Sequence, residues 1–109
     1  MEENYELAFE IILHAGNSKN NAMLAMKAAR NYDFNQAETF MKEAEKESIL
    51  SHEIQTKLIQ NEADGNKISV DLIMVHAQDH LCCAMQMMET ASEIIHIYKQ
   101  LSLLTKKGD

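Results

Sequence analysis

Residues 72–88 read LIMVHAQDHLCCAMQMM, and this stretch decides the expected fold. Apolar side chains would cover almost the whole circumference of a helix built from it. A helix that is apolar nearly all round is buried on more than one side. In a small bundle every helix also meets water, so we expect this helix to pack against its own chain and against other copies of it.

Polar side chains interrupt the apolar stretch at His76, Gln78, Asp79 and His80. Residues three and four apart are neighbours on a helix, so His76 should lie beside Asp79 and His80, while Gln78 points elsewhere. Steps of four and three define a seam that consists of Leu72, His76, Asp79, Cys83, Gln86 and Thr90. A plain coiled coil would carry Leu or Ile along such a seam. An imidazole and a carboxylate are costly to bury there without partners.

Three interpretations of His76 and Asp79 remain open from the residues alone. In the first, both side chains are structural and satisfy each other or a neighbouring helix. In the second, they bind a metal, with Cys83 as a candidate third ligand. Alternatively, His76 is a nucleophile, because a neutral imidazole has one free nitrogen that can attack phosphorus. If copies of the helix meet on an axis, their Asp79 carboxylates would converge, and a hard cation such as Mg²⁺ would suit that position.

The rest of the chain predicts an all-α fold with one domain over residues 1–109. The sequence has no proline and only 3 glycines, which permits long helices. Apolar periodicity places these helices at about 4–30, 34–63 and 69–104. The expected ends are a left-handed Asn31, a capping box of Asp33 with Gln36, Gly65 as the residue that ends the second helix, and Ser69 as the cap of the third. Gly16 suggests a kink or a close helix approach, and the tail 106–109 should be frayed.

Charge and composition exclude several classes of protein. A net charge of −7, without a large cluster of Lys or Arg, argues against nucleic acid and against an anionic membrane surface as partners. No stretch is long enough to span a bilayer, and the acidic start lacks the apolar core of a signal peptide. We therefore expect a cytoplasmic protein. Its adjacent Cys82 and Cys83 should be reduced thiols.

The other histidines give weaker signals. His14 and His52 stand singly on amphipathic helices and should be structural or exposed. Glu93 and His96 form a Glu-x-x-His pattern, which is typical of carboxylate-bridged metal bundles. Such bundles need a second copy of the pattern, and the chain has none.

The segment 71–81, DLIMVHAQDHL, resembles the signature of the lactose/cellobiose-specific IIA family of the bacterial sugar phosphotransferase system. The resemblance extends over about residues 5–104. It includes FEIILHAG at 9–16, the stretch from Ala44 to Gln60, and EIIHIY at 93–98. After Leu81 the family often has Met-Thr, where this chain has Cys82 and Cys83.

The resemblance implies a three-helix antiparallel bundle that assembles as a homotrimer of nine helices. It implies that His76 accepts a phosphoryl group from the phosphocarrier protein HPr and passes it to a cysteine of the IIB component, while the membrane IIC component delivers a β-linked disaccharide. It also implies that Asp79 binds Mg²⁺ at the trimer axis, one ion per trimer, and that His80 and Gln78 support the phosphorylation site. The alternative is a helical adaptor or metal-binding bundle without catalysis.

Overall fold

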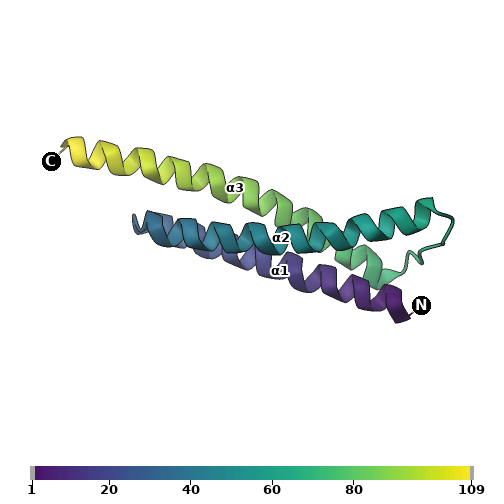
Figure 1. The fold of residues 1–109 in the computed structure, drawn as a ribbon. Helices are drawn as coiled ribbons and strands as arrows, with labels where there is room; N and C mark the ends of the chain where they lie inside the picture. The colour runs from purple at the N-terminus through teal and green to yellow at the C-terminus, as the bar shows by residue number, and fades with distance from the viewer. Residues whose placement is uncertain (1, 109) are drawn as a thin grey trace.

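Three long helices form the protein in a computed structural model that describes the backbone of residues 2–108 and the side chains of 4–105. These are α1 (Glu2–Arg30), α2 (Phe34–Ala63) and α3 (Leu72–Gly108). Each helix reverses the direction of the one before it, and the two ends of the chain lie at opposite ends of the molecule (Figure 1). The bundle is elongated, with extents of 64 × 19 × 19 Å. The predicted all-α three-helix fold is therefore confirmed, for a single copy of the chain.

The start of α3 differs from the prediction. The helix begins at Leu72, and the expected start at residue 69 with Ser69 as cap is wrong. Asp71 is the cap instead, because its Oδ1 accepts the Met74 N–H at 3.1 Å while its backbone carbonyl accepts the Val75 N–H at 3.0 Å. A side-chain oxygen that accepts from the third residue along is the usual N-cap arrangement.

The end of α3 also differs from the prediction. The helix does not fray after residue 104, since it continues to Gly108. No proline or glycine occurs between Leu104 and Gly108, so nothing in this part of the sequence breaks the helix earlier. The last residue of the predicted tail, Asp109, lies outside the described residues.

The turn after α1 uses Tyr32, and not the predicted Asn31, as its left-handed residue, with a φ of 60°. The Asp33 N–H donates to the Ala28 carbonyl at 3.0 Å, which closes the helix end in a Schellman motif. The same bond explains why the predicted capping box is only half formed. Asp33 Oδ1 accepts the Gln36 N–H at 3.2 Å, but the Asp33 N–H already donates to Ala28 and is not free to donate to the Gln36 side chain.

The two informative glycines behave differently. Gly65 ends α2 as predicted, with a φ of 95° that favours glycine, and the Asn66 N–H donates back to Asn61 at 3.0 Å. Gly16 does not mark a close helix approach. The helix runs through it unbroken, and a Cβ placed there would meet nothing within 4 Å.

Small side chains form the contact between α1 and the other two helices. The fully buried alanines are Ala8, Ala15, Ala22, Ala25 and Ala29 of α1, Ala37 and Ala44 of α2, and Ala77 and Ala91 of α3. Larger apolar groups gather where α3 begins, in a cluster that contains Ile11, Ile54, Leu58, Met74 and Leu81. Leu7, Met26 and Met41 lie half-buried at the edge of this core.

The outer face of α3 is exposed in the single chain. Its inner face carries Met74, Ala77, Leu81, Ala84, Ala91 and Ile95, all buried. On the outer face Leu72 is 85% exposed and Ile97 is 56% exposed. The seam residues between them, from His76 through Asp79 and Cys83, are exposed as well. One chain therefore covers only half of the apolar circumference of this helix.

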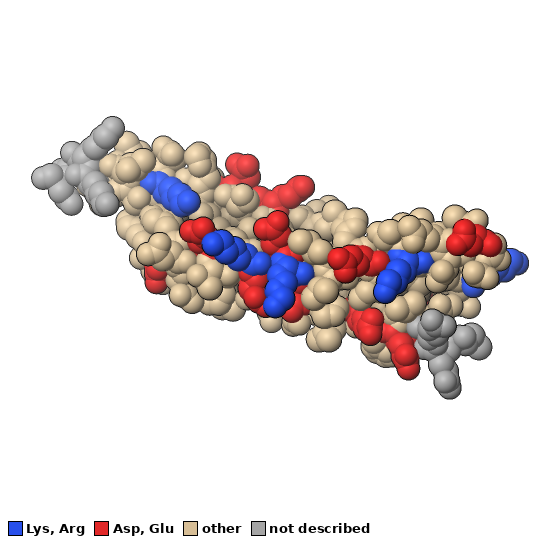
Figure 2. Space-filling view, in the orientation of Figure 1, with Lys and Arg blue, Asp and Glu red and all other residues tan. Residues whose placement is uncertain are grey.

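Charged residues of both signs are mixed over the surface seen in Figure 2, without a patch of one sign. Lys42 pairs with Glu38 at 3.4 Å on the exposed side of α2. Within the part of the chain that the structure describes, no helix is apolar and long enough to cross a membrane.

Replacing the cap of α3 should destabilise the protein. Asp71→Ala removes the acceptor of the Met74 N–H, and we expect a loss of about 1 kcal/mol in the free energy of unfolding. The matched control is Ser69→Ala, which should change stability by less than about 0.5 kcal/mol. Urea unfolding followed by circular dichroism, at one protein concentration, measures both. Equal losses would show that Ser69 shares the capping role.

Candidate functional site

His76 and His80 form a pair near the start of α3. Their Nε2 atoms are 3.1 Å apart, and the rings meet edge to face with an interplanar angle of 82°. At this distance one ring nitrogen can donate to the other, and the direction depends on the tautomers of the two rings. A nucleophilic imidazole requires a ring nitrogen with a free lone pair. The structure thus brings together the predicted acceptor and one of its predicted supporting residues.

The His76 side chain is open to a partner. It is exposed, and it borders a shallow hollow whose other lining residues are Tyr5, Asp71, Leu72 and Ile73. The Asp71 carboxylate in this hollow is engaged as the cap of α3. A mainly apolar hollow beside one imidazole is suited to transient binding of another protein.

Gln78 lies on another side of α3 and does not contact His76. Its amide makes a reciprocal pair with Gln55 of α2, at 2.6 Å and 2.8 Å, and its nitrogen also lies 3.7 Å from the Met74 sulfur. The pair is partly buried and joins α2 to α3 beside the core cluster. Of the two residues predicted to support the phosphorylation site, only His80 contacts His76, while Gln78 joins α2 to α3.

Asp79 and Cys83 form a second pair one turn further along the seam. The Cys83 thiol points to Asp79 Oδ1 at 3.8 Å, and both residues are exposed. Among the described residues Asp79 has no lysine or arginine partner. Its oxygens are donors that fit a hard cation. The described part of one chain nevertheless holds no cluster of three metal-ligand side chains, so a complete site would need ligands from other copies.

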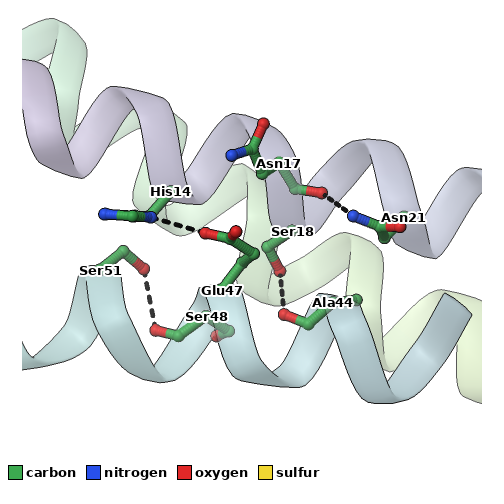
Figure 3. A network of polar contacts seen from close by, with 8 residues as sticks. All are labelled: His14, Asn17, Ser18, Asn21, Ala44, Glu47, Ser48 and Ser51. Carbon is green, nitrogen blue, oxygen red and sulfur yellow. Dashed lines mark hydrogen bonds and ion pairs between the residues drawn. The ribbon is translucent and has the colours of Figure 1, made fainter.

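A buried polar network joins α1 to α2 and includes His14 (Figure 3). The His14 Nδ1 and Glu47 Oε2 atoms are 2.6 Å apart, and the Ser18 hydroxyl donates to the Ala44 carbonyl at 2.8 Å. The structural interpretation of His14 is confirmed. Its partner Glu47, like Gln55 above, gave no signal in the sequence, because a contact between helices depends on their relative rotation.

The remaining candidates lie apart from this site. His52 is exposed on α2, as expected. His96 lines a hollow with Phe34 and Lys99 near the far end of the bundle, and no metal cluster forms around it among the described residues. Cys82 and Cys83 are both free and exposed, which agrees with the prediction of unpaired thiols.

Comparison with known proteins shows that the chain is similar in sequence and fold to members of one protein family. The family model "PTS system, Lactose/Cellobiose specific IIA subunit" matches residues 6–99. The lichenan-specific phosphotransferase enzyme IIA component of Bacillus subtilis is 45% identical over 101 residues, which are 93% of this chain and 92% of that protein.

Two solved structures have the same fold. The cellobiose-specific enzyme IIA of Bacillus anthracis superposes with a TM-score of 0.92 at 36% identity, over 94% of each chain. The chitobiose IIA protein of Escherichia coli, solved in complex with HPr, superposes with a TM-score of 0.80 at 33% identity, over 94% of this chain and 99% of that one.

The Gln55–Gln78 pair should show energetic coupling. Gln78→Ala leaves the Gln55 amide without its partner, and we expect a loss of about 1 kcal/mol in the free energy of unfolding. In a double-mutant cycle with Gln55→Ala, the two losses should be less than additive by about 0.5 to 1 kcal/mol. Strict additivity, measured by urea unfolding of the four proteins, would contradict the contact. The control is Gln60→Ala, because Gln60 is an exposed glutamine on α2, the helix that carries Gln55.

Proposed function

The chain belongs to the lactose/cellobiose-specific IIA family and is a phosphotransferase component of that sugar uptake system; from this membership we propose its place in the relay. It accepts a phosphoryl group from phospho-HPr on His76. It then passes this group to a cysteine of the IIB component, while the membrane IIC component brings in a β-linked disaccharide. The observation that carries the proposal is an exposed His76 in contact with His80 within the family's motif.

Each transfer exchanges one bond to phosphorus for another. The bond between phosphorus and the HPr histidine breaks as a bond forms to a ring nitrogen of His76. In the second step that bond breaks, and the IIB thiolate takes the phosphoryl group. Transfers of this kind pass through a loose in-line transition state, so positioning and charge stabilisation account for most of the rate.

His80 is the residue best placed to assist this exchange. Its Nε2 lies within hydrogen-bond distance of His76 Nε2, so it orients the ring of the acceptor before transfer. After transfer an N–H of His80 is available to donate to a phosphoryl oxygen. A superposable relative solved in complex with HPr supports HPr as the first donor.

We propose a homotrimer as the working form of the protein. A single chain leaves the outer face of α3 exposed, including Leu72 and Ile97. Contact with other copies would remove this apolar surface from water, which stabilises the assembly. The three Asp79 carboxylates would then meet on the axis and bind one Mg²⁺, which offsets their repulsion. His76 lies on the same seam, near the start of α3, and has to stay within reach of its partners in the assembly.

The partners and the compartment follow from the same family membership. HPr and IIB both act in the cytoplasm on the inner side of the membrane component, so we place this chain there. Its net charge of −7 favours encounter with a partner that carries a basic patch around its own phosphorylated residue. Neither nucleic acid nor direct insertion into the membrane has a part in this function.

Intact mass after incubation with phosphoenolpyruvate, enzyme I and HPr tests the acceptor. We expect the native protein to gain one acid-labile phosphoryl group and His76→Gln to gain none. His96→Gln is the control and should be phosphorylated normally. Phosphorylation of His76→Gln would show that another residue is the acceptor. No gain of mass in the native protein would favour a helical adaptor or a metal-binding bundle.

The supporting role of His80 predicts slower transfer. His80→Asn removes the contact with the His76 ring, and we expect phosphorylation by phospho-HPr to slow by about tenfold, as expected for a hydrogen bond of about 1.4 kcal/mol. Rapid-quench measurement of the first turnover gives this rate, with His52→Asn as control. An unchanged rate would leave His80 with no part in the reaction.

Replacement of Asp79 tests ion binding and trimer assembly separately. Asp79→Leu should remain a trimer in sedimentation equilibrium, because apolar side chains pack well on a seam, but it should lose bound Mg²⁺. Glu89→Leu, which replaces an exposed carboxylate off the seam, should keep the ion. Dissociation of the Asp79→Leu protein would mean that the ion itself holds the copies together.

A further inference from the structure

We propose that the hydroxyl of Tyr5 donates a hydrogen bond to the phosphoryl group on His76 and so stabilises the phosphorylated form of the protein. The inference rests on the proposed function, because it requires His76 to be the acceptor. It deepens that function with a residue that family membership does not assign, since the family model matches residues 6–99 and Tyr5 lies just before them.

Tyr5 and His76 come from different helices and line the same hollow. The start of α1 lies beside the start of α3 (Figure 1), which brings Tyr5 to the first turns of α3. The other described residues that line the hollow are Asp71, Leu72 and Ile73. The hollow has a volume of about 540 Å³. Because one water molecule occupies roughly 30 Å³, a phosphoryl group on His76 fits there together with its first waters.

Tyr5 supplies a donor that the rest of the hollow lacks. A phosphoryl group carries about two negative charges and three acceptor oxygens. Leu72 and Ile73 have no side-chain donor, and the Asp71 carboxylate is an acceptor that already caps α3. Besides His76 itself, the Tyr5 hydroxyl is therefore the one side-chain donor among the described residues that line the hollow.

An uncharged donor in this position suits a carrier that must give its phosphoryl group away again. Tyr5 is 42% exposed, so its hydroxyl is accessible to a group that enters the hollow. A hydrogen bond to a charged acceptor favours the phosphorylated form by about tenfold, without the stronger attraction of an ion pair. His80 is not one of the lining residues, so the two donors approach the phosphoryl group from different sides.

The equilibrium of the phosphoryl group between HPr and this protein tests the donor. Phospho-HPr and the full chain are mixed in equal amounts, and intact mass gives the phosphorylated fraction of each. Tyr5→Phe keeps the ring and removes only the hydroxyl, so we expect the equilibrium to shift toward phospho-HPr by about tenfold. The phosphorus NMR signal of the phosphohistidine should also move, because its oxygens lose a donor. Tyr32→Phe is the matched control and should behave as the native protein, since Tyr32 is 44% exposed and lies just beyond the other end of α1.

A second variant separates the hydroxyl from the ring. Tyr5→Leu removes both, and it should shift the equilibrium no further than Tyr5→Phe. An equilibrium that is unchanged in Tyr5→Phe, shifted equally in Tyr32→Phe, or shifted only in Tyr5→Leu would overturn the role of the hydroxyl and leave His76 as the acceptor. A native protein that takes no phosphoryl group from HPr would overturn the proposed function itself, and this inference with it.

Discussion

The close packing of small side chains along α1 is the constraint on which the rest of the structure depends. Alanines that are fully buried on all three helices let α2 and α3 approach α1 closely over most of its length. Each of these small side chains buries little apolar area. The inner face of α3 supplies the buried residues that this helix adds to the core. The other face of α3 is then left outside, with its apolar residues and its polar seam available to other molecules.

That outer face carries the candidate functional site. His76 and His80 come first along it, followed one turn later by Asp79 and Cys83, and each pair lies within direct contact distance. A rigid helix serves such a site well, because the spacing of its side chains is fixed before any partner arrives. We propose that the face meets other copies of the chain along its seam, while His76, near the start of α3, meets HPr and IIB in turn.

Local rules predicted most of the fold and part of the site. Apolar periodicity predicted the span of α2, and the rules for helix ends predicted the left-handed position at Gly65. The four-residue spacing on a helix predicted the contact between His76 and His80. The start of α3 was missed because Ser69 and Asp71 both suit a cap, and only the backbone conformation distinguishes them. Pairs such as Gln55 with Gln78 depend on how two helices are rotated against each other, which no pattern within one helix specifies.

Discharge of the phosphorylated protein tests most directly whether the chain is a carrier. The protein is first phosphorylated through HPr, freed of its donors and then mixed with the cognate IIB component, while the intact mass of each is followed. The phosphoryl group should leave this chain as it arrives on the IIB cysteine, and HPr added instead should take it back. A phosphohistidine that IIB cannot discharge, or a protein that HPr never phosphorylates, would contradict a carrier role.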